Sequence, residues 1–116
     1  VIIPEYVKKD NETYTVKSIG GGIFGGSTSL TDVTIGANVK SIGYQAFANC
    51  TRLSTITVKS EGLNIVNASA FSGLPSTGTI YIPDGKITDT AYQELFTNAG
   101  LPSGWTFKTL AEKPAE

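Results

Sequence analysis

Short stretches of alternating apolar and polar residues recur along the chain at a nearly constant interval. Residues 30–35 read Leu-Thr-Asp-Val-Thr-Ile, residues 53–58 read Leu-Ser-Thr-Ile-Thr-Val, and residues 79–83 read Thr-Ile-Tyr-Ile-Pro. The Ile-Pro pair at residues 82–83 also occurs at residues 3–4, so the chain opens near the end of a similar stretch. Alternation with a period of two is typical of strands with one buried face. The pattern predicts a series of short strands.

Each predicted strand is followed by a second extended stretch and then by a compact turn that carries a Phe residue. The second stretches are residues 16–19, 39–42 and 63–66. A period of 23 or 24 residues is typical of a solenoid, in which equivalent residues of successive coils lie about 4.8 Å apart. We therefore expect an aromatic stack and an aliphatic ladder inside the coils. The stack comprises Phe24, Phe47 and Phe71, and the ladder comprises Ile35, Val58 and Ile82.

The ends of the chain depart from the period. Two short strands flank a turn-forming Asp-Asn-Glu cluster, which predicts a β-hairpin inserted near residues 6–16 of a solenoid that spans residues 1–86. Residues 88–99 have the pattern of a helix, with Thr88, Asp89 or Thr90 as alternative N-caps, and Gly100 and Pro102 as stop signals.

On this predicted helix, Ala91, Leu95, Phe96 and Ala99 lie on one face at helical spacing. Residues 105–107 read Trp-Thr-Phe and alternate like a strand. The ends of a solenoid expose core and strand edges and therefore need caps. We expect residues 87–110 to form a helix–strand cap and residues 111–116 to form a flexible tail.

The fullest repeat carries several features at fixed spacing. Residues 30–53 contain Ser41-Ile42-Gly43, Ala46-Phe47 and Asn49-Cys50-Thr51 after the strand pattern, and the pattern continues more weakly from residue 1 to about residue 83. This repeat resembles the BspA-like leucine-rich repeat of the treponemal type. The resemblance implies a right-handed superhelix with a parallel β-sheet on its concave face, mainly β with short turns or 3-10 segments and one C-terminal capping helix.

The resemblance also implies a setting and a role. Members of this family are secreted or displayed on the bacterial cell surface, and they are associated with adhesion and with binding of host proteins. The family has no catalytic motif that could be transferred to this chain. The low content of charged residues, 16%, and the abundance of Thr, Ser, Asn and Gly agree with a neutral polar surface of that kind.

Composition excludes several other functions. The net charge of −1 leaves no basic surface for nucleic acid. The chain has no His, which is the commonest general base and metal ligand, and it has no apolar run long enough to span a membrane. Because the chain opens inside a repeat, we interpret it as a processed or truncated piece, whose signal or anchor would lie elsewhere.

The outward residues of the predicted sheet form the candidate binding surface. Strand alternation places them in rows, one with Asp32 and the next with Thr34, and Ile2 begins the second row. Regular rows on a sheet suit recognition of a partner, although Thr is also simply a good strand residue. Tyr81 strengthens the binding interpretation, because exposed aromatic residues favour interfaces. The candidate residues are Asp32, Thr34, Thr55, Thr57, Lys59, Thr79 and Tyr81.

Other candidate sites have simpler structural explanations. Cys50 lacks a neighbouring base and occupies a turn position that we expect to be buried. The acidic residues Asp84, Asp89 and Glu94 lack the ligand spacing of an EF-hand. The run of three Gly at residues 20–22 lacks the Lys-Ser/Thr ending of a phosphate-binding loop and corresponds to a repeat turn.

We therefore expect a non-catalytic module that binds a host or bacterial surface protein or a glycan through the concave sheet, without cofactor or metal. We expect no binding of nucleic acid and no insertion into a membrane, and we expect the module to be at the cell surface or secreted. One alternative is a structural spacer or terminal cap of a longer stalk, with no ligand of its own. Another is an accessory module of an enzyme whose catalytic domain lies elsewhere.

Overall fold

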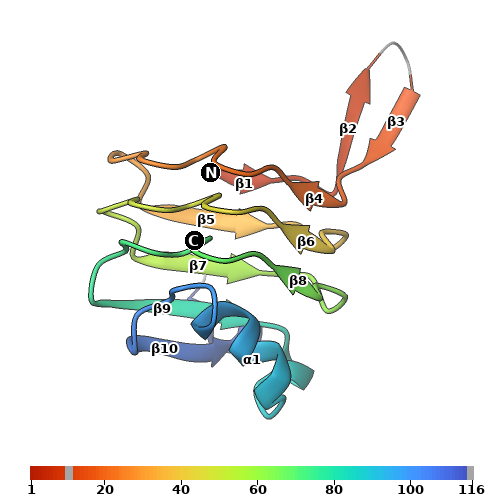
Figure 1. Ribbon diagram of the computed structural model, residues 1–116. Coiled ribbons are helices and arrows are strands. Elements are labelled where there is room, and N and C mark those ends of the chain that lie inside the picture. The colour runs from red at the N-terminus through yellow and green to blue at the C-terminus, as the bar shows by residue number, and fades with distance from the viewer. Residues whose placement is uncertain (10–11, 115–116) are drawn as a thin grey trace.

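The computed structural model describes residues 1–9 and 12–114, and for residues 6–9 and 12–15 it describes the backbone alone. Short strands follow one another with turns between them (Figure 1). The strands are β1 (Ile2–Ile3), β2 (Tyr6–Lys9), β3 (Glu12–Thr15), β4 (Ser18–Ile19), β5 (Asp32–Ile35), β6 (Ser41–Ile42), β7 (Thr55–Val58), β8 (Ile65–Val66), β9 (Thr77–Ile82) and β10 (Gly104–Thr109). The helical elements are the 3-10 helices η1 (Asp84–Lys86) and η2 (Leu110–Glu112) and the α-helix α1 (Thr90–Thr97).

The first strand of each repeat belongs to a parallel sheet that we call the major sheet. Among the described residues its strand order is β1-β5-β7-β9-β10. Thr34 is in register with Thr57, and Thr57 with Tyr81, so residues one sequence period apart are neighbours. The predicted rows of equivalent residues are therefore confirmed.

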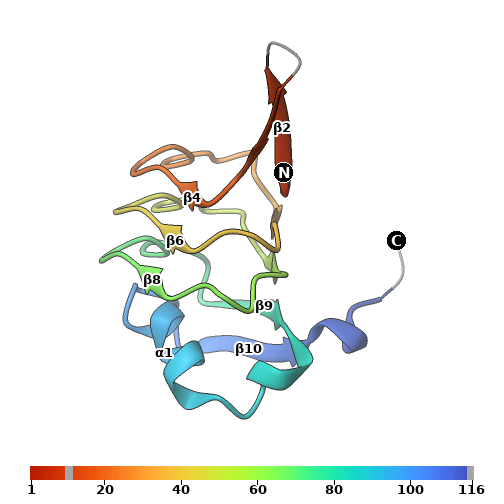
Figure 2. The same cartoon turned by 90° about the vertical axis from the view of Figure 1, so that its right-hand side faces the viewer.

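The second extended stretch of each repeat forms another parallel sheet, with the order β4-β6-β8, which we call the minor sheet. Ile19 is in register with Ile42, and Ile42 with Val66. Figure 2 shows the two sheets on opposite sides of the stacked coils, with the minor sheet on the left and β9 of the major sheet on the right. The chain is a solenoid in which each coil contributes one strand to each sheet.

The predicted aromatic stack runs through the coils. The rings of Phe24 and Phe47 lie 5.3 Å apart at an interplanar angle of 7°, and those of Phe47 and Phe71 lie 5.6 Å apart at 5°. Backbone hydrogen bonds join the same turns, since Phe24 N donates to Ala46 O at 2.9 Å and Phe47 N donates to Ala70 O at 2.8 Å. The predicted aliphatic residues Ile35, Val58 and Ile82 are fully buried in the same core.

The predicted hairpin is present and projects from the stack. Strands β2 and β3 pair antiparallel, with Tyr6 opposite Thr15 and Lys9 opposite Glu12. The hairpin stands away from both parallel sheets at the N-terminal end of the solenoid (Figure 1). The turn predicted at Asp10 and Asn11 lies outside the described residues.

The C-terminal helix forms with one of its three predicted N-caps, but its predicted bounds are wrong. It spans Thr90–Thr97 instead of residues 88–99, and its N-cap is Asp89, whose side chain accepts a hydrogen bond from Tyr92 N at 3.0 Å. Its buried residues are Tyr92 and Phe96, whereas Ala91 is exposed. The hydroxyl of the buried Tyr92 donates to Ser60 O of the preceding coil at 2.6 Å.

Strand β10 is longer than the predicted residues 105–107 and extends the major sheet. It pairs in parallel with β9 over its whole length, from Gly104 opposite Thr77 to Thr109 opposite Ile82. The Trp105 indole donates to Pro75 O at 2.8 Å and lies over Gly78, where a Cβ would come within 2.6 Å of the ring. The division into a solenoid (1–86) and a cap (87–110) stays a prediction, and both parts contribute to one hydrophobic core.

The chain continues from β10 into η2. At its start, Thr109 N and Thr109 Oγ1 donate to Glu112 Oε1 at 3.0 and 2.9 Å, which makes a capping box. Residues 111–114 of the predicted tail therefore begin with a hydrogen-bonded turn, and the flexibility of the tail stays a prediction. Among residues 1–9 and 12–114, no helix is both long enough and apolar enough to cross a membrane.

Candidate functional site

The candidate site is the side of the major sheet that points away from the core. On β5, Val33 and Ile35 are buried while Asp32 and Thr34 point outward, as alternation requires. Parallel register continues these two positions onto the next strands, and we call the resulting surface the outward face. It contains the predicted residues Asp32, Thr34, Thr55, Thr57, Lys59, Thr79 and Tyr81.

Accessibility changes sharply along the second row of this face. Ile2, at its N-terminal edge, is 74% exposed, and Thr34 beside it is half-buried. Thr57 and Tyr81, next in the same row, are only 3% and 8% exposed. The expectation that Tyr81 is an exposed aromatic residue is therefore wrong, although its position in the row is right.

The C-terminal segment of residues 110–114 lies over the part of the face where the row becomes buried. The ammonium group of Lys113 is 6.0 Å from the centre of the Tyr81 ring, within the range of a cation–π contact. Ala111 N donates to Asp84 Oδ1 at 3.3 Å, and η2 contacts β9. Figure 2 shows the chain running from β10 outward and then upward on the outer side of the sheet.

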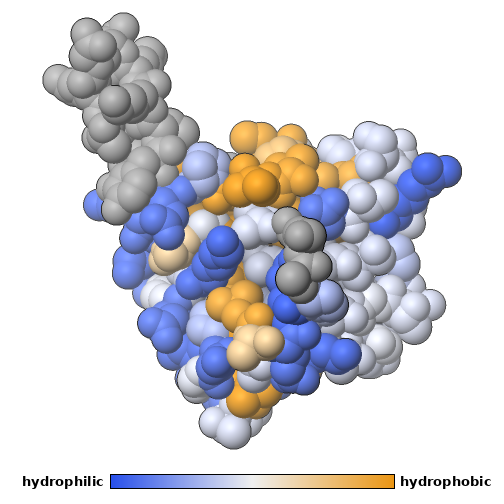
Figure 3. Space-filling view, turned by 180° about the vertical axis from the view of Figure 1, so that it is seen from behind, coloured by the Kyte–Doolittle hydropathy of each residue, from blue (hydrophilic) through white to orange (hydrophobic). Residues whose placement is uncertain are grey.

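A cleft of about 580 Å³ lies between the outward face and this segment. Clefts of roughly 300–1,000 Å³ are typical of ligand sites. Seen from behind in Figure 3, the surface mixes hydrophilic residues with an apolar patch along its upper, N-terminal edge. The residues that line the cleft are Ile2, Asp32, Thr34, Thr57 and Lys59 on the sheet side, and Leu110, Lys113 and Pro114 on the segment side.

Charges of both signs surround the cleft. The carboxylate of Asp32 lies 4.0 Å from the terminal ammonium of Val1 and accepts a hydrogen bond from Thr31 Oγ1 at 3.3 Å. Lys59 is exposed at the margin. Hydrogen bonds from Thr109 lower the pKa of the Glu112 carboxyl, so this group is anionic near neutral pH. The cleft therefore combines charged and hydroxyl side chains with the apolar residues Ile2, Leu110 and Pro114, which suits contact with a protein chain of mixed character.

Sequence reasoning missed the segment side of the cleft and the last strand of the face. Thr106 lies opposite Thr79, and Lys108 lies opposite Tyr81. The alternation at residues 105–107 was a usable signal for these positions, because it puts Thr106 on the side opposite Trp105. The repeat pattern does not extend to Leu110, Lys113 or Pro114, so periodicity could not predict that they lie over the sheet.

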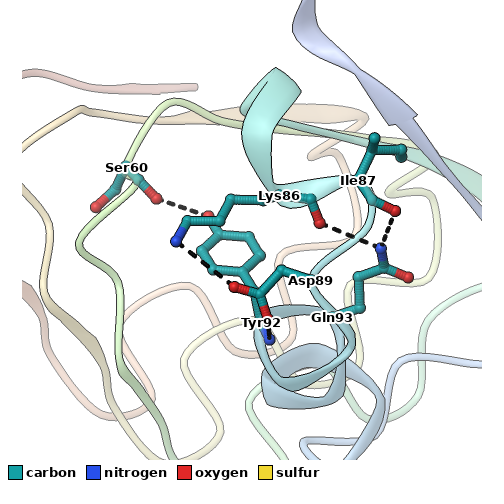
Figure 4. Close-up of polar contacts among 6 residues, drawn as sticks. All are labelled: Ser60, Lys86, Ile87, Asp89, Tyr92 and Gln93. Atoms are coloured by element: carbon teal, nitrogen blue, oxygen red, sulfur yellow. Dashed lines mark hydrogen bonds and ion pairs between the residues drawn. The ribbon is translucent and has the colours of Figure 1, made fainter.

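A second groove, of about 350 Å³, separates α1 from the loop after β7. Figure 4 shows that the groove residues Lys86, Asp89 and Tyr92 are joined to one another and to the preceding coil by polar contacts. The Lys86 ammonium lies 3.6 Å from Asp89 Oδ2 and 5.5 Å from the Tyr92 ring centre, and Gln93 Nε2 donates to Ile87 O at 2.8 Å. The groove is lined by Glu61, Gly62, Leu63, Asn64, Lys86, Asp89, Ala91, Tyr92 and Leu95.

The acidic residues considered for calcium are not brought together. Asp84 accepts from Ala111 N and Asp89 caps α1, while Glu94 is exposed on that helix. Within residues 1–9 and 12–114, no group of three or more His, Cys, Asp or Glu side chains is placed to hold a metal ion.

Cys50 and the glycine run occupy the turn positions expected for them. The Cys50 thiol is fully buried and donates to Phe24 O at 3.1 Å. Burial raises the pKa of this thiol, and a hydrogen bond from the Ser27 backbone opposes the rise only partly. The glycine run lies in the first repeat turn, where Gly22 N donates to Tyr44 O of the next coil at 2.9 Å.

Comparison with known proteins agrees with the repeat architecture. The BspA type leucine rich repeat region matches residues 7–108, in six copies. Comparison with curated proteins and with solved structures found no significant match. The matched span begins within β2 and includes the minor sheet, strands β5, β7 and β9 of the major sheet, α1 and most of β10, so it includes the cap as well as the regular coils. The chain therefore belongs to the BspA-type leucine-rich repeat family.

Proposed function

We propose that this chain is a non-catalytic binding module that contacts a partner protein through the outward face of the major sheet. The observation that carries the proposal is the in-register pair of rows on that face, which present hydroxyl groups beside the cleft. Strands fix the spacing of these groups, so a partner meets a rigid and regular surface. We further propose that the parent protein is bacterial and is secreted or displayed at the cell surface.

A protein partner is favoured over a glycan by the state of Tyr81. Exposed aromatic rings offer large contact area at low conformational cost. Tyr81, the aromatic residue of this face, is only 8% exposed, while Ile2 at the edge is 74% exposed. An exposed aliphatic side chain beside polar rows resembles the mixed apolar and polar character of protein interfaces. A glycan remains the second arm of the test.

The non-catalytic part of the proposal rests on the chemistry that the chain carries. The sequence contains no His, and its single thiol, Cys50, is buried and held in the core with a raised pKa. A nucleophile requires access and an activating base. The hydroxyl groups of the outward face belong to Thr residues that neighbour other Thr residues, so they suit hydrogen bonding.

A double substitution on the accessible part of the face tests the proposal. Thr34→Lys with Thr55→Lys places two long charged side chains on half-buried positions of neighbouring strands. The matched control is Thr51→Lys with Thr97→Lys, which makes the same chemical change at exposed positions elsewhere. The parent chain is screened against an array of extracellular-matrix proteins and against a glycan array.

We expect a matrix or surface protein to bind the parent and the control alike. The face variant should lose at least about tenfold in affinity, or ~1.4 kcal/mol. Equal binding by the face variant would overturn the outward face as the site. Binding confined to the glycan array would replace the protein by a glycan as the partner.

The alternative function is a structural spacer or terminal cap. The packing of α1 and β10 onto the last coil favours this candidate, because together they cover the C-terminal end of the core. A spacer has no ligand, so absence of binding on both arrays would favour it. The stability of such a spacer would depend on the aromatic stack of Phe24, Phe47 and Phe71.

A further inference from the structure

We propose that residues 110–114 form a displaceable cover of the outward face. This segment hides Tyr81 and Thr57 until a partner protein displaces it. The inference rests on the proposed function, because it concerns the regulation of the same face. In the covered state Thr57 and Tyr81 are buried, while Thr34 and Lys108 on either side of them in the row stay accessible. In the uncovered state the accessible part of the face includes the only aromatic ring that the described outward face carries.

The position of Tyr81 shows that its burial is not a property of the strand. Its register partners in the row are Thr57 on β7 and Lys108 on β10. A Thr side chain is too small to cover a phenol ring, and Lys108 is itself exposed. The ring is met instead by Lys113, whose ammonium lies 6.0 Å from its centre, and η2 contacts the same strand.

The segment stands on the face without filling the space beneath it. The cleft of about 580 Å³ lies between them and opens on Thr57, Leu110 and Lys113. The contacts of residues 110–114 with the rest of the chain include the exposed hydrogen bond from Ala111 N to Asp84 Oδ1, at 3.3 Å. The capping box joins Glu112 to Thr109, the last residue of β10, and so shapes the start of the segment at the end of that strand. Exposed polar contacts of this kind are individually weak, so the segment can be displaced.

The covering side chain indicates what displaces it. Lys113 places a cation over the Tyr81 ring, and the carboxylates of Asp84 and Asp32 lie along the same side of the sheet. The geometry therefore fits a partner protein that presents an extended segment with a Lys or Arg side chain. That side chain would replace Lys113 over the ring, and the partner's neighbouring backbone would meet the Thr hydroxyls.

The cover can be tested without any partner, by nitration of tyrosine with tetranitromethane. Tyr44, Tyr81 and Tyr92 fall on three different tryptic peptides, so each is quantified separately by mass spectrometry. Tyr44 is 56% exposed and reports full reactivity, while Tyr92 is 4% exposed in the core and reports unfolding. The proteins compared are the full chain, a variant that ends at Thr109, and the full-length variant Glu112→Ala with Lys113→Ala. The matched control is Lys17→Ala with Glu94→Ala, which removes the same charges at exposed positions outside the cleft.

We expect Tyr81 to react at least about fivefold faster in the shortened and double variants than in the full chain and the control, because access governs the rate. Tyr92 should stay protected throughout. If Tyr92 becomes reactive in the shortened chain, that chain has lost its fold. The reactivity of Tyr81 in the full-length variant Glu112→Ala with Lys113→Ala then tests the proposal. If Tyr81 remains as protected in the folded variants as in the full chain, its neighbours in the sheet bury it, and the proposal is wrong.

Binding assays then separate this proposal from the proposed function. Uncovering should raise the affinity of a partner at least about tenfold if the partner competes with the segment for Tyr81. A peptide with Lys or Arg should slow nitration of Tyr81 in the variant that ends at Thr109, because it shields the uncovered ring. Faster nitration of Tyr81 in the shortened and double variants, together with no ligand on either array, would support the cover and reject the proposed binding function.

Discussion

The ring of Phe96 on α1 lies 5.7 Å from the ring of Phe71 and is tilted by 45° to it. The two preceding ring pairs in the stack are nearly parallel, at 7° and 5°. Phe71 N donates to Ala99 O at 3.0 Å, which matches the coil-to-coil bond from Phe47 N to Ala70 O. The helix therefore takes the place of the next repeat turn, and its tilted ring ends the aromatic stack.

The aromatic stack should dominate the stability of the solenoid. Phe47 is fully buried between Phe24 and Phe71, so Phe47→Ala should lower the free energy of unfolding by about 3–5 kcal/mol. Urea denaturation followed by circular dichroism measures the loss. The control is Tyr44→Ala, three residues away and 56% exposed, which should cost less than about 1 kcal/mol. A loss below about 1 kcal/mol for Phe47→Ala would contradict the stack as the centre of the core.

Two glycines at the same repeat position should respond differently to substitution. Gly43 ends the Ser-Ile-Gly triplet of β6, and a Cβ there would lie 2.5 Å from Gly21 N of the coil above. Gly43→Ala should therefore cost about 1–3 kcal/mol, as overpacking does. Gly20 ends the same triplet one coil earlier, and a Cβ there would meet no described atom within 4 Å.

Gly20→Ala serves as the matched variant for Gly43→Ala. It should be neutral or should stabilise the chain by about 0.4–1 kcal/mol, since it restricts the unfolded chain. Thermal and urea unfolding of the two variants provides the comparison. Equal losses for both would mean that the glycine is required by the local backbone and not by the neighbouring coil.

Tyr92 should make the chain lose stability at alkaline pH. Burial, followed by the charges of Glu61 and Asp89, raises the pKa of its phenol. In the unfolded chain the phenol ionises near pH 10, while the folded chain retains the proton to higher pH. Above pH 10 the folded state therefore binds more protons, and stability falls by up to about 1.4 kcal/mol per pH unit from this group.

Tyr92→Phe should remove that part of the alkaline loss. At pH 7 the same variant should cost about 1–2 kcal/mol, because Ser60 O loses the donor that lies 2.6 Å away. Urea unfolding at pH 7, 10 and 11 gives both quantities, and Tyr44→Phe, which removes an exposed phenol, is the reference. If the free energy of unfolding changes with pH in the same way for Tyr92→Phe and the parent, Tyr92 ionises alike in the folded and unfolded states, which would contradict the prediction.

The thiol of Cys50 should report unfolding. It is fully buried, donates to Phe24 O at 3.1 Å and has a raised pKa, so little reactive thiolate is accessible in the folded chain. We expect slow reaction with a disulfide reagent at pH 8 in buffer and rapid reaction in concentrated urea. Phe47→Ala should accelerate the reaction in buffer, since it loosens the neighbouring turn. Reaction of the native parent at the rate of a free thiol would contradict the buried position.

Periodicity explains why so much of the regular solenoid was predictable. A repeat of 23 or 24 residues places Asp32 opposite Thr55 and Thr34 opposite Thr57 once coils stack, and the structure has these pairs. The same reasoning correctly predicted the stacked Phe rings. It missed the role of Phe96, because the helix has its own local spacing and joins the stack only through packing.

The cap was less predictable than the coils. Helical propensity indicated a helix but not which of its sides would face the core. Packing against the preceding coil made that choice: Tyr92 and Phe96 are buried in the core, and the Tyr92 hydroxyl donates to Ser60 O, 32 residues earlier in the chain. Ala91, which belongs to the apolar face that the sequence indicated, is exposed.

The order of residues alone determined the direction of each side chain on the major sheet, because alternation along a strand is local and stacking follows from the repeat. Only the tertiary structure decided which outward side chains solvent can reach. Tyr81 and Ile2 share a row, yet one is 8% and the other 74% exposed. The difference arises where residues 110–114, which belong to no repeat, return across the sheet. Burial depends on contacts between segments distant in the chain, and no local pattern contains that information.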